Sequence, residues 1–174
     1  NYLIIQNEVG NAKVMGVIKA DAYGHGAIEI AKSLSQTKIH GFCVALIKEI
    51  IELRENSITK PILHLGKLPA SNLDIFTGST LCTINSFEDI HIIQNHFINN
   101  GIKISAHIKF DTGMGRMGFH YSEAQEILTK IHQCEAINLE GIYSHFSTAE
   151  DTDTTFMELQ RFRFDEIVKF SKLL

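Results

Sequence analysis

Short runs of apolar and β-branched residues alternate along the chain with longer segments whose apolar residues repeat at helical spacing. The short runs predict strands over residues 14–20, 41–46, 61–65, 81–85, 104–110 and 139–144. The longer segments predict helices over residues 27–35, 48–55, 70–76, 87–99, 122–133 and 155–172, with Ser122 as an N-cap. This alternation implies right-handed βαβ units and therefore a parallel sheet.

The spacing of apolar residues also assigns faces to two of these helices. Around the helix over 48–55, the residues predicted to face the core are Leu46, Ile50 and Leu53. The residues predicted to form its solvated face are Lys48, Glu49, Glu52, Arg54 and Glu55. In the last helix, the residues predicted to share one buried face are Phe156, Leu159, Ile167 and Phe170.

Two architectures are compatible with these strand and helix units. A doubly wound sheet usually carries the motif GxGxxG after its first strand, and the chain has no such motif there. A (β/α)8 barrel needs two more units than the six predicted here, so six units are too few to close one. No linker, low-complexity stretch or internal repeat divides the chain, which predicts a single domain.

The composition indicates a folded chain that binds a small molecule. With 174 residues, 44% of them hydrophobic and 21% charged, the chain is long enough for one domain with a core. The net charge is −4 and the basic residues are scattered, which is not the pattern of a nucleic-acid binder. We also expect no membrane partner, since no apolar run approaches the roughly 18–20 residues of a span.

Other features concern the compartment and the start of the chain. Cys43, Cys82 and Cys134 are odd in number and form no CxxC pair, which argues against a disulfide framework and favours a reducing, cytoplasmic compartment. The histidines show no HExxH or other ligand spacing, so we predict no metal site. The N-terminus lacks the features of a signal peptide and also an initiator Met, so we expect the chain to begin inside a longer one.

The first candidate for chemistry is Lys19, which lies at the end of the first predicted strand and before a glycine-rich turn. In a barrel, the carboxyl ends of the strands form the active site. A lysine there loses hydration, which favours the neutral amine that attacks an aldehyde. The same pattern also fits a lysine that extends to solvent beside an ordinary turn, and spacing alone leaves both interpretations open.

Two further predicted strands end in polar groups. Lys109 is separated by a loop with glycines from Arg116, whose planar guanidinium can bind a carboxylate or a phenolate-like oxygen. Lys109, Asp111 and Arg116 could equally form a solvated charge network. His145 follows the sixth predicted strand, where a lone histidine is more often a packed side chain than a catalyst. Because a barrel brings its strand ends to one rim, we expect these groups to share a site with Lys19.

Residues 17–26 (VIKADAYGHG), 109–119 (KFDTGMGRMGF) and 144–146 (SHF) resemble three signatures of the alanine racemase family, in the same order and spacing. Weaker similarity includes 61–63 (PIL) and Gln160 with Arg161-Phe162, so that the resemblance covers essentially the whole chain. It implies the (β/α)8 TIM-type barrel of a fold-type III enzyme that depends on pyridoxal 5'-phosphate. Residues 1–174 would be its incomplete N-terminal, cofactor-binding barrel domain, with about six βα units.

The resemblance also implies a role for each candidate residue. Lys19 would hold pyridoxal phosphate as an internal aldimine and act as one of two catalytic bases. Tyr23 would help to hold the cofactor phosphate, and His145 would lie beside the pyridine ring. Arg116 would contact the phenolic oxygen of the cofactor and the substrate carboxylate. Lys109 matches a position that is often N-carbamylated (an N-carboxylysine), and the added charge would orient Arg116.

The reaction that the resemblance implies is the interconversion of L-alanine and D-alanine for bacterial peptidoglycan, in a cytoplasmic homodimer. The second base would be a tyrosine of the partner subunit's C-terminal domain. That mostly β domain and the last barrel units are absent from these residues, so we expect a fragment of a longer polypeptide. A racemase for serine or for several amino acids is one alternative, and an inactive barrel fragment that only binds cofactor or a partner is another.

Overall fold

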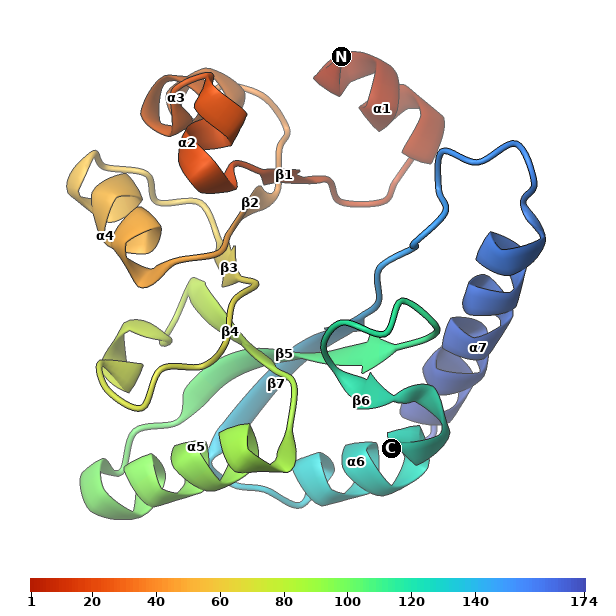
Figure 1. Cartoon of the computed structure of the whole chain (residues 1–174). Coiled ribbons are helices and arrows are strands. Elements are labelled where there is room, and N and C mark those ends of the chain that lie inside the picture. The colour runs from red at the N-terminus through yellow and green to blue at the C-terminus, as the bar shows by residue number, and fades with distance from the viewer. The chain divides into compact units, whose positions relative to one another are not determined.

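The computed structural model describes all of residues 1–174, and the chain forms two compact units. The first unit comprises Asn1–Gly66 and Gly78–Leu81, and the second comprises Lys67–Thr77 and Cys82–Leu174. Strand β4 (Thr80–Ile84) therefore begins in the first unit and ends in the second. Each unit consists of parallel strands that alternate with helices along the chain (Figure 1).

In the first unit, strands β1 (Met15–Val17), β2 (Gly41–Val44) and β3 (Ile62–His64) pair in parallel in sequence order, and β3 also pairs with the start of β4. The helices of this unit are α1 (Tyr2–Val9), α2 (Lys19–Gly24), α3 (Ala27–Ser35) and α4 (Ile47–Glu55). All residues of β2 and β3 are buried. Burial on both faces explains why these strands are continuous apolar runs rather than alternating ones.

In the second unit, β5 (Ile104–Asp111) is the central strand, because it pairs in parallel with β4, with β7 (Ile137–Tyr143) and with the short β6 (Phe119–His120). The helices are α5 (Phe87–Asn100), α6 (Ala124–His132) and α7 (Thr155–Ser171), and the single 3-10 turns are η1 (Leu73–Ile75) and η2 (Tyr121–Glu123). The side chains at the centre of its core are Ile84, Ile93, Ile104, Ile108, Phe110 and Ile127.

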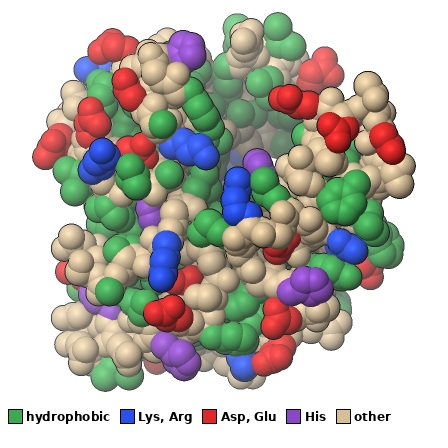
Figure 2. Space-filling view, in the orientation of Figure 1, with side chains coloured by type: hydrophobic (Ala, Val, Ile, Leu, Met, Phe, Trp, Pro, Cys, Tyr) green, Lys and Arg blue, Asp and Glu red, His purple; other side chains and the backbone are tan.

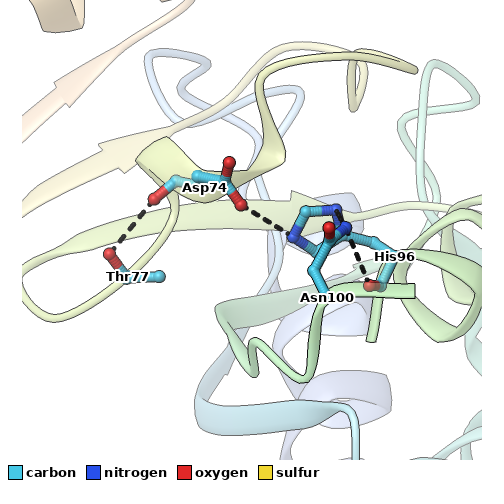
Figure 3. Close-up of polar contacts among 4 residues, drawn as sticks. All are labelled: Asp74, Thr77, His96 and Asn100. Carbon is cyan, nitrogen blue, oxygen red and sulfur yellow. Dashed lines mark hydrogen bonds and ion pairs between the residues drawn. The ribbon is translucent and has the colours of Figure 1, made fainter. Parts of the chain in front are cut away.

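Helix α5 shows how local chemistry sets the ends of an element. The Ser86 hydroxyl accepts the Asp89 N–H at 3.2 Å, the Asp89 carboxylate accepts the N–H of Ser86 at 3.1 Å, and Gly101 ends the helix in a left-handed conformation. At the other end of α5, the His96 ring lies 3.0 Å from an oxygen of Asp74 in η1 (Figure 3). This contact fastens η1 to the last turns of α5.

Most predicted strands and helices are confirmed within one to three residues at each end, and the differences have local causes. The helix predicted over 70–76 is only the turn η1, because Asn72 takes a left-handed conformation just before it. The prediction of Ser122 as an N-cap is wrong: its hydroxyl lies 2.8 Å from Nδ1 of His120, within η2, and α6 begins at Ala124. Helices α1 and α2 and strand β6 were not predicted.

The predicted faces of α4 are partly wrong. Ile50 and Leu53 are buried as predicted, but Leu46 precedes the helix and is 48% exposed. Arg54 is not on a solvated face, since its guanidinium donates to the carbonyl oxygens of Ile58 (2.6 Å) and other backbone and hydroxyl oxygens of the same unit. Glu49 is half-buried because its carboxylate accepts three backbone N–H groups.

The buried face of α7 also differs from the prediction. Ile167 is buried and Phe170 is half-buried, but Phe156 and Leu159 are 38% and 41% exposed. Gln160 is fully buried in their place. The reason is chemical, because its side-chain amide forms hydrogen bonds with groups of two neighbouring loops.

The surface carries mixed charge. Acidic and basic side chains both lie on the face shown in Figure 2. None of the helices combines the length and the apolarity that crossing a bilayer requires.

Candidate functional site

Lys19 is delivered by the carboxyl end of β1. The strand ends at Val17, and the N–H of the buried Ile18 donates to the carbonyl oxygen of Cys43 in β2 at 3.0 Å. Lys19 follows as the first residue of α2 and is half-buried. The strand predicted over 14–20 is thus too long, but Lys19 still lies just beyond the carboxyl end of a parallel strand.

The residues after Lys19 form a left-handed turn that the sequence did not predict. Ala20, Asp21, Ala22 and Tyr23 have φ values between 51° and 56°, which is costly for residues that carry a Cβ. Hydrogen bonds from within and from α3 help to hold the turn: Ala22 N–H donates to Ile18 O at 2.9 Å, and Ala27 N–H donates to the Asp21 carboxylate at 2.7 Å. The turn leaves Tyr23 62% exposed.

Lys109 lies in β5 of the second unit and is only 5% exposed. Its Nζ donates to the carbonyl oxygen of Met117 at 2.6 Å. Burial and the nearby charge of Arg116 lower the pKa of Lys109, and the charge of Asp111 opposes them. The neutral amine is therefore more accessible at Lys109 than at an exposed lysine.

The loop after β5 is shaped by a carboxylate and by glycine. Burial disfavours the charged form of Asp111, but the N–H groups of Gly113, Gly115 and Met114 and the charge of Lys109 lower its pKa overall. Gly118 has a φ of 109°, and a Cβ there would lie 2.7 Å from the carbonyl oxygen of Lys109. Arg116 lies in this loop and is exposed, so that its guanidinium is available to an anionic ligand.

His145 lies two residues beyond the end of β7 and is exposed. The residue before it, Ser144, donates from its hydroxyl to Phe110 O at 2.8 Å and lies 2.8 Å from the hydroxyl of Thr112. Gln160 of α7 donates to both Thr112 Oγ1 (3.2 Å) and the carbonyl oxygen of His145 (3.1 Å). These bonds tie the loops after β5 and β7 to each other and to α7.

Gln160 is the structural residue of this region that sequence reasoning missed. The helical spacing i, i+4, i+7, i+11, i+14 along α7 selects Phe156, Gln160, Arg163, Ile167 and Phe170. Two polar residues on that stripe were the available signal. Both are used, because Arg163 Nη1 also donates to the carbonyl oxygen of Thr112 at 2.7 Å.

The predicted site residues divide between the two units. Lys19 and Tyr23 lie in the first unit, whereas Lys109, Arg116 and His145 lie in the second. Within the second unit, β5 and β7 are parallel neighbours, so that the loops with Arg116 and His145 leave from the same edge. That all five side chains serve one site stays a prediction.

Comparison with known proteins gives a consistent family. The sequence model of the family "Alanine racemase, N-terminal domain" matches residues 1–172 of this chain. An alanine racemase of Clostridium kluyveri is 38% identical over 171 residues, which cover 95% of this chain and 44% of that protein. One of Lactococcus lactis subsp. cremoris is 39% identical over 160 residues, which cover 91% of this chain and 43% of that protein.

Solved structures agree with these relatives. The alanine racemase of Clostridium difficile 630 in complex with cycloserine has a TM-score of 0.84 and 38% identity, over 92% of this chain and 44% of that chain. Residues 1–174 thus span about 44% of the length of the relatives they match. Parallel strands with alternating helices, as in the TIM-barrel-like α/β part of these proteins, confirm the predicted fold class. The chain belongs to the alanine racemase N-terminal domain family.

Proposed function

We propose that this chain is the cofactor-binding part of a pyridoxal phosphate-dependent racemase that interconverts L-alanine and D-alanine for peptidoglycan, in the cytoplasm. The observation that carries the proposal is the placement of Lys19 just beyond the carboxyl end of β1, followed by a strained turn that presents Tyr23. Strain of this kind is concentrated at functional sites. Relatives named alanine racemase at 38% and 39% identity support the choice of reaction.

The candidate side chains fit the cofactor chemically. Lys19 would hold it covalently through its amine, and the exposed Tyr23 hydroxyl would donate to its phosphate. Arg116 and His145 would contact the phenolic oxygen and the ring, respectively, and both are exposed on loops after parallel strands. When bound, pyridoxal phosphate supplies an electron sink that acidifies the α-hydrogen of an amino acid.

The remaining chemistry is the work of the protein. When its amine is free, Lys19 would remove or return the proton at the α-carbon on one face of the substrate. Arg116 orients the substrate, because its planar fork pairs with a carboxylate. We propose that Lys109 is N-carbamylated and orients Arg116, which its burial and lowered pKa support, since only a neutral amine reacts with carbon dioxide.

Racemisation needs a second base on the opposite face of the substrate. We propose that it is a tyrosine of the partner subunit in a homodimer, outside these 174 residues. The isolated chain should then bind cofactor but produce little or no D-alanine. Robust D-alanine production by residues 1–174 would contradict this assignment.

The proposal is tested by mixing the purified chain with pyridoxal phosphate, reducing with borohydride and mapping the modified peptide by mass spectrometry. We expect the cofactor on Lys19, and we expect its absorbance band to be lost in Lys19→Ala. Lys13→Ala is the matched control, since Lys13 is exposed and lies before β1. The absence of any adduct on Lys19 at saturating cofactor would overturn the proposal for this chain and leave an inactive fragment as the alternative.

A further inference from the structure

Glu49 of α4 uses its two carboxylate oxygens for two different purposes. Oε2 accepts the N–H groups of Ala45 and Leu46 at 2.8 and 2.9 Å, which satisfies backbone donors at the start of the helix. Oε1 accepts the N–H of Ala20 at 2.7 Å, from a residue 29 positions earlier in the chain. The second bond is not needed to begin a helix.

Helix α5 provides an internal comparison for that point. Its Asp89 occupies the same third helical position and accepts the N–H groups of Asn85 and Ser86 through one oxygen, Oδ2, at 2.8 and 3.1 Å. An aspartate is therefore long enough to cap a helix of this chain. The longer side chain of Glu49 does the same and also extends to the turn that follows β1.

The group that Glu49 reaches is the peptide between Lys19 and Ala20. Fixing the N–H of Ala20 fixes the plane of that peptide, and with it ψ of Lys19 and φ of Ala20, the first residue of the left-handed turn. Hydrogen bonds from backbone N–H to a carboxylate are shorter and about twice as strong as neutral ones. A bond from a different element thereby restrains the backbone at Lys19.

Neighbouring residues hold the backbone that Glu49 binds. His64, at the end of β3, is only 2% exposed and makes a hydrogen bond with the backbone of Ala45, the residue whose N–H binds Glu49. Glu49 therefore follows a β2–α4 turn that is held in place by a buried side chain of the neighbouring strand.

We propose that Glu49 is a positioning residue for Lys19, which holds the Lys19–Ala20 peptide so that the amine points correctly for the cofactor aldehyde. The inference rests on the proposed function of Lys19. The amphipathic pattern predicts only that the Glu49 carboxylate is solvated, whereas the proposal gives this carboxylate a role.

Glu49→Asp separates positioning from capping. The shorter side chain withdraws the carboxylate by about 1.5 Å, which turns the 2.7 Å contact with Ala20 into one beyond hydrogen-bond range, whereas capping persists as in Asp89. Glu49→Gln provides the second variant, because an amide offers a single acceptor oxygen. Asp89→Asn is the matched control, since it weakens a cap of the same kind far from Lys19 in sequence.

The first measurement is amide hydrogen exchange in the cofactor-free chain. We expect the Ala20 amide to exchange at least about tenfold faster in both Glu49 variants, the size expected for loss of a hydrogen bond to a charged group. The amide of Ala22, which donates to Ile18 O, should change less. The second measurement is the dissociation constant for pyridoxal phosphate, which should rise about tenfold in folded Glu49→Asp and stay unchanged in Asp89→Asn.

The two proposals fail in different ways. Unchanged Ala20 exchange in folded Glu49→Asp and Glu49→Gln, or unchanged cofactor affinity in a chain that does bind it on Lys19, would overturn the positioning role and leave the proposed function standing. Failure of the unsubstituted chain to bind cofactor would overturn the proposed function. The exchange of the Ala20 amide would then still decide whether Glu49 holds that peptide.

Discussion

Gln160→Leu removes the hydrogen bonds that connect α7 to two loops of the second unit. The Gln160 side chain is fully buried. Its amide nitrogen donates to Thr112 Oγ1 and His145 O, and its Oε1 accepts the N–H and the hydroxyl of Ser147 at 2.9 and 3.0 Å. Leucine has a similar size but replaces none of these bonds.

The magnitude follows from these four contacts. A hydrogen bond contributes about 1 kcal/mol net, and a buried partner left unsatisfied costs about 1–3 kcal/mol. Thr112 is 1% exposed and keeps its bond to Ser144, whereas Ser147 is exposed and can turn to water, so that only part of the full cost applies. The apolar surface that leucine buries offsets about 1 kcal/mol. We therefore expect the free energy of unfolding to fall by about 2–4 kcal/mol, a large share of the roughly 5–15 kcal/mol of a domain.

Urea unfolding monitored by circular dichroism measures this change. Gln125→Leu is the control, because Gln125 lies exposed on α6 and the same substitution there should alter stability by less than about 0.5 kcal/mol. If Gln160→Leu were no more destabilising than Gln125→Leu, the network between α7 and the loops would not stabilise the second unit. The reasoning about buried polar groups would then be refuted at this position.

Two further predictions concern lysine and cysteine chemistry. Burial and Arg116 lower the pKa of Lys109, so the fraction of neutral amine grows as the pH rises towards that lowered value. Bicarbonate labelled with carbon-13 should therefore give a carbamate signal that strengthens at mildly alkaline pH and disappears on mild acidification. The signal should be absent in Lys109→Arg. Burial raises the pKa of Cys43 to about 11 and that of Cys82 to about 12. A thiol reagent should therefore label the half-buried Cys134 in the folded chain, and Cys43 and Cys82 only after unfolding. Rapid labelling of Cys43 or Cys82 in the folded chain would contradict the buried positions of β2 and β4.

The strands could be predicted from the sequence because their burial leaves a local signal. The run over 104–110 is apolar at most positions and becomes β5, Ile104–Asp111, and the run over 41–46 becomes β2, Gly41–Val44. Helix α3 has the predicted bounds, Ala27–Ser35. Burial on one helical face or on both faces of a strand selects residue types at fixed periods, so pattern suffices for these elements.

The left-handed turn after Lys19 could not be predicted in the same way. Residues 20–23 contain no glycine, and local preferences disfavour four successive positive φ values at such residues. The conformation depends on bonds that the chain forms only when folded, from Ala20 to Glu49 and from Ala27 to Asp21. The sequence thus located the lysine but not the geometry around it.

Two misassigned polar residues and one overlooked polar residue have a common physical cause. Glu49 and Arg54 were predicted to be solvated, and Gln160 was assigned no place in the fold, because an amphipathic pattern compares each residue only with its neighbours on one helix. Loops that follow parallel strands leave backbone groups without ladder partners, and these groups must be satisfied by side chains from elsewhere. Glu49 does this for the turn after β1, and Gln160 does it for the loop after β7.

The helices of this fold therefore support the candidate site through polar residues rather than only through their apolar faces. The loop after β5 is held at Thr112 by both Gln160 and Arg163, which lie on the buried stripe of α7. A substitution at either residue should disturb the loops of Arg116 and His145 without removing any group proposed to bind a ligand. Polar residues that interrupt an apolar helical stripe therefore indicate positions where a helix side chain supplies hydrogen bonds to a loop.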